Sequence, residues 1–336
     1  MNRTSGNRLK EMLAVALAVF LILGGRLAWL QLYKGLYYGR QADGNRMRSS
    51  VIMAPRGRIM DRHGKVLADS SPGYVLSLQA GHSFSDSEVN LLAQLLAMPP
   101  DVIRKKADRA ANTYEQIVIK GELTSREITL LEEHVKELPG VSLDLQPMRH
   151  YLYGESAAHV LGYVGEVSEE QLKQGKYKGL SPGSIVGKEG LEFVYDTVLR
   201  GQTGRKTEEV DVRGKVVRKL GGQAPLSGKG LVLTIDFALQ QDLERVMDKQ
   251  LAALRSSGIA PNAFAAAAVA MDPNTGAVRA LVSRPGYDPN WFVGGISSAH
   301  WKLINENSFH PLTNKVINGE YPAGSTFKVV TGYWAA

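Results

Sequence analysis

The segment YPAGSTFK, residues 321–328, precedes the apolar pair Val329 and Val330. Its proline and glycine indicate a turn from which a helix begins near Ser325. Because side chains three residues apart share one face of a helix, the Lys328 amine can reach the Ser325 hydroxyl and take its proton. Backbone N–H groups at a helix start can also face the negative charge that develops on an attacked carbonyl. The segment therefore predicts Ser325 as a nucleophile and Lys328 as its general base.

A plainer interpretation of the same residues stays open at this point. Serine is a common N-cap of ordinary amphipathic helices, and a serine followed three residues later by lysine also occurs by chance. Ser325 is the only serine of the chain with a lysine at that spacing. The rest of the sequence has to decide between a cap and a nucleophile.

Length and composition bound the class of protein. The 336 residues, 44% of them apolar, leave room for two modest globular domains. The chain has no cysteine, which excludes disulfides and thiolate metal sites, and its seven histidines include no helical i, i+4 pair. We therefore expect no metal and no cofactor. The net charge of +7 is spread along the chain without a dense basic run, which argues against nucleic acid and favours an anionic membrane surface or cell-wall polymer.

The amino-terminal region carries an apolar segment. Residues 12–25 are unbroken apolar sequence, and the segment reaches membrane-spanning length when it is extended to Leu32. Arg26 then lies near one end, and Trp29 begins a set of interfacial aromatic residues. A cleaved signal peptide is the competing interpretation, but no cleavage pattern follows closely. We expect a transmembrane anchor at residues 12–32 after a tail at 1–11; the basic residues on both sides do not decide its orientation.

The middle of the chain alternates short strands and helices. Residues 51–68 read as two extended segments around a turn at 61–64, and residues 73–78 alternate as a strand. Helical spacing covers residues 85–97 and 125–138, the second with a capping box at Thr124 and Glu127, and a hairpin is expected within 206–220 with its turn at Arg213-Gly214. Arg56, Asp61 and Arg62 lie beside a turn, so we interpret them as structural ion-pairing groups and not as a catalytic cluster.

The last third reads as a second folding region. We expect a strand at 230–235, then a helix that Asp236 caps and that runs to Leu254, with its apolar face at 239, 243, 246, 247, 251 and 254. Residues 263–271 form a continuous apolar run, typical of a strand buried on both faces, and residues 277–283 return as its partner. Asp288 lies among turn formers and is expected to cap a loop.

Several ordered stretches between residues 26 and 328 resemble the class B penicillin-binding proteins. They are RLAWLQ at 26–31, APRGRIMDRHGKVLA at 54–68, PGV at 139–141 with RHY at 149–151, AHVLGYVG at 158–165, GLEFVYD at 190–196 and LRG at 199–201, followed by the Ser-x-x-Lys pattern. The run EVDVRGKVVRKL at 209–220 is closer to the elongation-type branch than to the septal one.

The resemblance implies an α+β fold with five parts. These are a cytoplasmic tail (1–11), a transmembrane anchor (12–32), a juxtamembrane linker (33–50), a mixed α/β pedestal of the dimerisation type (51–230), and a truncated penicillin-binding/transpeptidase domain of the serine β-lactamase-like fold (231–336). It places the protein in the bacterial inner membrane as a single-pass protein with its catalytic domain outside the cytoplasm.

The resemblance also implies an activity. Ser325 would form an acyl-enzyme with D-Ala-D-Ala stem peptides of peptidoglycan in a D,D-transpeptidase reaction, and β-lactams would be trapped on it. Lys328 would be buried and partly desolvated, so that its amine is neutral and serves as the base. The family's Ser-x-Asn and Lys-Thr-Gly motifs do not occur after Lys328, so we expect the 336-residue chain itself to be inactive. Expected partners are a SEDS-family glycan polymerase and proteins of the elongation or division complex.

Two other functions fit parts of the sequence. The Ser-x-x-Lys pattern also fits a membrane-anchored β-lactam hydrolase or sensor, although the long pedestal between anchor and serine argues against it. A non-catalytic protein of the cell-wall complex, with an anchor, a pedestal and a vestigial catalytic fragment, is the other alternative.

Overall fold

The computed structural model describes residues 3–34, 47–113, 116–210 and 216–335. The chain divides into two compact units. One comprises Met1–Ser50 with Arg205–Gln223, and the other comprises Val51–Gly204 with Ala224–Ala336.

The first unit contains the apolar helix and a small sheet. Helix α1 (Arg3–Ala28) continues into a π-helical turn, η1 (Trp29–Tyr33). Within the described residues, one helix is long and apolar enough to cross a membrane, at Met12–Leu32, as predicted. The guanidinium of Arg26 and the amine of Lys34 lie 4.7 and 4.9 Å from the Trp29 ring, so cationic and aromatic groups gather at one end of this segment.

Three strands form the sheet of this unit, in the order β1-β8-β9. They are β1 (Met47–Ile52), β8 (Gly204–Val210) and β9 (Val216–Gln223), and β8 and β9 pair antiparallel. The hairpin expected within 206–220 is confirmed in its strands. Its turn at Arg213-Gly214 lies outside the described residues.

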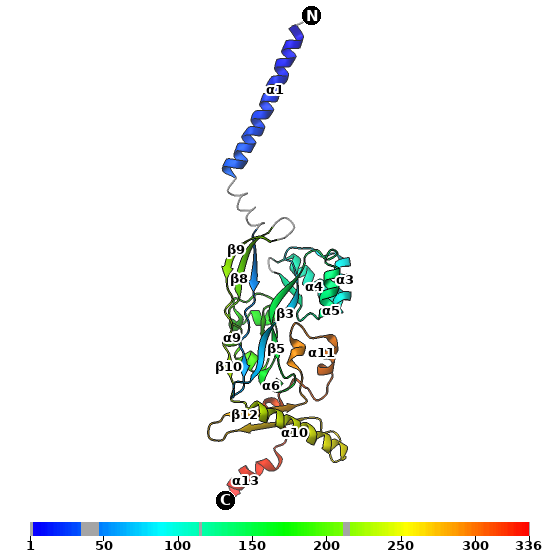
Figure 1. Ribbon diagram of the computed structural model, residues 1–336, viewed down its shortest axis with the longest axis vertical. Helices are drawn as coiled ribbons and strands as arrows, with labels where there is room; N and C mark the ends of the chain where they lie inside the picture. The colour runs from blue at the N-terminus through cyan, green and yellow to red at the C-terminus, as the bar shows by residue number, and fades with distance from the viewer. Residues whose placement is uncertain (1–2, 35–46, 114–115, 211–215, 336) are drawn as a thin grey trace. The chain divides into compact units, whose positions relative to one another are not determined.

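Strand β3 (Val66–Leu78) is the centre of the second unit (Figure 1). Strand β5 (Val141–Tyr151) pairs with it antiparallel along its whole length. On its other edge lie β2 (Ile59–Met60) near its start and β4 (Ile117–Lys120) near its end, and β10 (Leu231–Val232) runs parallel to β2. One sheet therefore includes a strand near the beginning of the pedestal sequence and a strand that directly follows its end.

Two apolar cores lie along β3. Helices α3 (Asp86–Leu96), α4 (Pro100–Ala111) and α5 (Ser125–Glu133) pack with the end of the strand in one core (Figure 1). The start of β3 packs with Tyr151, Leu161 and Phe237 in the other. Helices α3 and α5 begin with capping boxes at Ser85 and Thr124, and the second of these confirms the prediction. The sequence analysis did not predict α4, β4 or β5.

Short elements follow β5 and complete the pedestal. They are α6 (Ala158–Leu161), β6 (Val164–Glu166), α7 (Glu169–Leu172), the 3₁₀ turn η2 (Gly175–Tyr177), β7 (Ile185–Gly187), α8 (Gly190–Val194) and α9 (Asp196–Leu199). Strands β6 and β7 pair antiparallel.

The C-terminal part begins with α10 (Phe237–Ser256), which lies across the hairpin of β11 (Ala266–Met271) and β12 (Val278–Arg284) (Figure 1). The Asp236 side chain accepts from the Leu239 N–H, which confirms the predicted cap. The remaining elements are η3 (Pro289–Phe292), α11 (Ser298–Asn305), α12 (Lys315–Asn318), η4 (Gly324–Phe327) and α13 (Lys328–Ala335). Asp288 caps η3 by accepting from the Asn290 N–H, also as predicted.

Two predictions for this part are wrong. Strand β11 alternates between half-buried and exposed residues, so the described residues cover one of its faces and not both. Helix α10 leaves Leu239 and Val246 exposed and buries Gln240 and Glu244 instead. The reason is that these two polar side chains find partners. Gln240 bonds to the backbone of β12, and Glu244 accepts from the pedestal, so tertiary hydrogen bonds override the apolar pattern.

Candidate active site

Ser325 lies in the 3₁₀ turn η4, and Lys328 is the first residue of α13. The predicted turn that opens a helix is therefore confirmed. Both side chains are exposed, so the predicted burial of Lys328 is wrong for the described chain. In the described part of the chain no hydrogen bond joins the two side chains, although catalytic hydrogen bonds often tighten only when substrate binds.

The loop that leads to this turn, residues 310–315, is held by Lys315 and Ser283. The Lys315 side chain is buried, and its Nζ donates to the carbonyl oxygens of His310 at 3.0 Å and Thr313 at 3.5 Å. Burial lowers the pKa of Lys315. On β12, the Ser283 hydroxyl donates to the Thr313 carbonyl and accepts from the Lys315 N–H at 3.1 Å. The loop is thereby fixed to the hairpin that supports it.

Asp61 joins the APRGRIMDRHGKVLA stretch at 54–68 to the start of α10. Its Oδ1 accepts from the N–H groups of His63 and Lys65, both at 2.8 Å, and its Oδ2 accepts from the Phe237 N–H at 3.3 Å. Burial acts to raise the pKa of Asp61, but these three backbone donors outweigh it and lower the pKa below its ordinary value. The Arg62 N–H also donates to the Ile235 carbonyl. Asp61 is a structural group, as interpreted, but its partners are backbone N–H groups and not the expected ion-pair partners.

Three stretches of the chain approach one another very closely beside this contact, near residues 57, 199 and 228. A Cβ added to Gly57 would lie 2.0 Å from the Lys229 carbonyl oxygen, and one added to Gly228 would lie 1.7 Å from the Leu199 carbonyl oxygen. Both positions therefore require glycine, because any side chain would push the backbones apart. Residues of three separate stretches, near 57, 199 and 228, pack backbone against backbone here.

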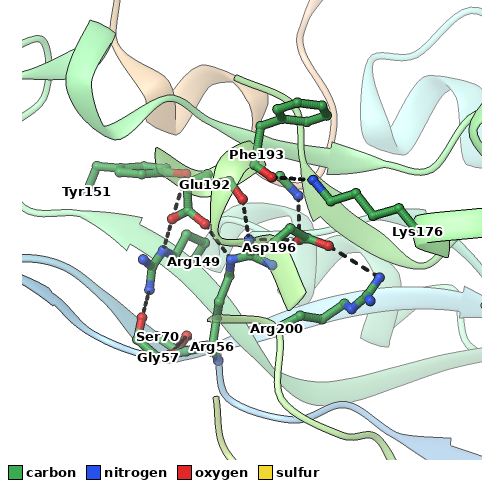
Figure 2. A network of polar contacts seen from close by, with 11 residues as sticks. Arg56, Gly57, Ser70, Arg149, Tyr151, Lys176, Glu192, Phe193, Asp196 and Arg200 are labelled. Carbon is green, nitrogen blue, oxygen red and sulfur yellow. Dashed lines mark hydrogen bonds and ion pairs between the residues drawn. The ribbon is translucent and has the colours of Figure 1, made fainter. Parts of the chain in front are cut away.

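A buried ion cluster lies beside this junction (Figure 2). The Glu192 carboxylate accepts from Arg56 Nε on one oxygen and from Arg149 Nε on the other, the latter at 2.7 Å. Glu192 and Asp196 are both fully buried, and Asp196 Oδ1 pairs with Arg56 Nη2 at 2.9 Å. We call Arg56, Arg149, Glu192 and Asp196 the ion cluster. A third guanidinium, that of Arg200, lies with its Nη1 3.4 Å from Asp196 Oδ2, so three positive groups pair with the two buried carboxylates.

Further hydrogen bonds tie the ion cluster to the backbone. Arg149 Nη1 donates to the Gly57 carbonyl at 2.8 Å, and the Gly187 N–H donates to Asp196 Oδ1 at 2.8 Å. Burial acts to lower the pKa of Arg56, and the two carboxylates outweigh it, so the pKa is raised. Arg56 therefore stays charged and acts as an ion-pairing structural group, which confirms that interpretation.

Sequence reasoning did not single out Arg149, Glu192, Asp196 or Lys315. The first three lie in the RHY and GLEFVYD stretches, which were noted only for their resemblance. The one available signal was an acidic residue within an otherwise apolar short helix, at Glu192. Within the described ranges, no group of three or more His, Asp or Glu residues could hold a metal ion.

Comparison with known proteins identifies the family. The penicillin-binding protein dimerisation domain matches residues 51–233, and the penicillin-binding protein transpeptidase domain matches residues 266–336. The chain belongs to the class B penicillin-binding proteins.

Its named relatives include the peptidoglycan D,D-transpeptidases MrdA. The one of Acinetobacter baumannii is 34% identical over 320 residues, which cover 94% of this chain and 46% of that protein. That of Escherichia coli K12 is 32% identical over 329 residues, covering 95% and 50%. The chain thus spans about half the length of the curated relatives it matches.

Two solved structures share the fold. The complex between penicillin-binding protein PBP2 and MreC from Helicobacter pylori contains a chain that is 25% identical with a TM-score of 0.66, covering 85% of this chain and 52% of that one. A peptidoglycan synthase complex, described as coordinating polymerization and crosslinking, contains one that is 32% identical with a TM-score of 0.53, covering 93% and 52%.

The Asp61 contacts predict a pH-dependent contribution to stability. Because the folded pKa of Asp61 lies below its ordinary value of 3.8, its contribution is complete above about pH 4 and is lost as the pH falls through the folded pKa. Asp61→Asn should therefore cost about 1–3 kcal/mol of unfolding free energy at pH 7, and less at pH 3. Urea unfolding at both pH values measures this.

Asp108→Asn provides the control, since the Asp108 side chain is exposed. The role of the Asp61 carboxylate would be contradicted if Asp61→Asn cost no more unfolding free energy than Asp108→Asn at pH 7, or if its cost grew as the pH falls.

Proposed function

We propose that this chain is part of a peptidoglycan D,D-transpeptidase in which Ser325 is the acylated nucleophile and Lys328 is its general base. The observation that carries the proposal is the Ser-x-x-Lys spacing at the start of a helix, within the segment that matches the transpeptidase domain. Relatives named D,D-transpeptidase align with 94–95% of the chain, so the similarity includes the pedestal and not only the serine motif. This favours a transpeptidase over a β-lactam hydrolase or sensor.

The reaction follows from the chemistry of a serine nucleophile. Lys328 takes the proton of the Ser325 hydroxyl, and Oγ attacks the carbonyl carbon of the penultimate D-alanine. The peptide bond breaks, the terminal D-alanine leaves with the proton on its nitrogen, and an ester to Ser325 stays behind. An amine of a neighbouring strand then attacks the ester, which forms the cross-linking amide and returns the proton to Ser325. A β-lactam opens its ring on the same oxygen and stays as an ester.

We further propose the parts of the chain and their location. Residues 1–11 form a cytoplasmic tail, 12–32 the anchor in the bacterial inner membrane, 33–50 a linker, 51–230 the pedestal and 231–336 the beginning of the transpeptidase domain. The pedestal and the transpeptidase domain lie outside the cytoplasm. The apolar span and the two domain matches support this layout. The protein should stay with membranes in alkaline carbonate, and its C-terminal part should be digested by protease added to spheroplasts. Release by carbonate or protection from the protease would contradict the layout.

We also propose that the pedestal binds a SEDS-family glycan polymerase and proteins of the elongation or division complex. The support is the similarity to a chain of a peptidoglycan synthase complex and to a penicillin-binding protein solved with MreC. Co-purification of the whole protein with such a polymerase after mild detergent extraction tests this. If the membrane is kept intact until extraction and the protein still purifies without the polymerase, the proposed partnership would be contradicted.

Labelling with a fluorescent penicillin tests the nucleophile and the base in the whole protein. The native protein should be labelled stably on a denaturing gel, and Ser325→Ala should abolish the label. Lys328→Ala should keep the fold but slow acylation by about 10²–10⁴-fold, the usual contribution of a general base. Ser308→Ala, a change at another exposed serine, should label like the native protein.

Labelling of Ser325→Ala would reject the nucleophile. Rapid loss of the label from the native protein, with release of the opened lactam, would instead identify a hydrolase.

A further inference from the structure

His159 is a pedestal residue whose polar contacts go to the loop before the nucleophile. It lies on α6, and its Nε2 is 2.7 Å from the Pro311 carbonyl oxygen. Because a carbonyl oxygen only accepts, Nε2 carries the proton and donates it. The His159 carbonyl in turn accepts from Asn314 Nδ2 at 3.5 Å. Side chain and backbone of one residue thus hold both ends of the short stretch 311–314.

The surroundings keep this histidine neutral and fixed. Its ring packs edge-on against Tyr287, with ring centroids 5.2 Å apart, and the Tyr287 hydroxyl donates to the Ala158 carbonyl. Burial lowers the pKa of His159 to about 4. The hydrogen bond to Pro311 acts to raise this pKa, and the nearby positive charges of Lys315 and Arg284 lower it further. At neutral pH the side chain is therefore an uncharged donor.

Helix α6 is itself anchored from both sides. Its Leu161 packs in the apolar core at the start of β3. The N–H of Ala157, the residue before the helix, donates to Glu244 Oε1 of α10 at 2.9 Å, and the Ser156 hydroxyl donates to Oε2 at 2.7 Å. His159 is therefore presented from a rigid support.

The loop that His159 holds is the last well-buried part of the chain before the nucleophile. Pro311 and Lys315 are buried, whereas residues 321–325 and 327–334 are exposed. Gly319 accommodates the turn after α12, where a Cβ would lie 2.4 Å from the Lys315 carbonyl oxygen. The loop, α12 and this turn follow one another directly and lead to the segment that carries Ser325.

We propose that His159 is a positioning residue for Ser325, through which the pedestal fixes the loop at 310–315 and thereby the approach of the nucleophile. The inference rests on the proposed function, because it assumes that Ser325 is acylated. The hydrogen bond to Pro311 joins the AHVLGYVG stretch of the pedestal to the transpeptidase segment.

The rate constant of acylation by a fluorescent penicillin, measured per folded molecule of the whole protein, tests the inference. His159→Phe keeps a ring but removes the donor, and His159→Gln keeps a donor at a similar reach. Misplacement of a reacting group by about 1 Å can cost 10²-fold in rate, so His159→Phe should slow acylation at least about tenfold. His159→Gln should recover most of the rate, and the final labelled fraction should stay complete in both.

Leu131→Ala is the matched control, since Leu131 packs in the core at the end of β3, away from α6 and from the loop at 310–315. It should lower the melting temperature but leave the acylation rate of the folded protein unchanged. Equal rates in the native protein, His159→Phe and Leu131→Ala would overturn the inference while leaving the proposed function intact. Failure of the native protein to be labelled would overturn the proposed function, and the inference with it.

Discussion

The second unit of the structure depends on the ion pairs of Glu192 with two guanidinium groups (Figure 2). The Glu192 carboxylate lies between these groups and has no exposed surface. Burying a charge costs several kcal/mol unless opposite charges and hydrogen bonds replace the lost water. Here the replacement comes from Arg56 and Arg149, which are distant in sequence from Glu192. The acid can therefore be buried only when β5, which carries Arg149, and the segment between β1 and β2, which carries Arg56, are packed beside it. The ion cluster makes correct assembly of three sequence stretches a condition for its own stability.

From this cluster the contacts continue toward the segment that carries Ser325. Arg149 holds the Gly57 carbonyl, and Gly57 lies against the backbone of Lys229 just before α10. Asp61 then caps the entry of α10 through the Phe237 N–H. Helix α10 packs on β12, whose Ser283 holds the loop before Ser325. Buried contacts thus join the pedestal to the transpeptidase segment, from Arg149 to Ser283.

The elements that the sequence predicted well are those whose cause is local. The capping box at Thr124, the cap at Asp236 and the turn between β11 and β12 each depend on residues a few positions apart. Strand β5 was missed because Pro147 interrupts the pattern of a strand. In the sheet, Pro147 lies opposite Pro72 of β3, so the two residues that lack an N–H face each other. The buried face of α10 was misjudged because Gln240 and Glu244 are buried through partners 41 and 87 residues away. The Ser-x-x-Lys pair could be read directly, whereas the ion cluster and the Lys315 loop arise only when distant segments meet.

Equilibrium unfolding of Glu192→Gln, compared with Glu189→Gln, is the most direct test of this account. Glu189 is an exposed neighbour of the same short helix, so its substitution should change stability little. Removing the Glu192 charge leaves two buried arginines short of a partner and should cost about 3–5 kcal/mol. The account predicts that the 51–230 region and α10 then lose structure together at a lower urea concentration. A Glu192→Gln protein as stable as the Glu189→Gln control would show that the ion cluster does not hold this unit together.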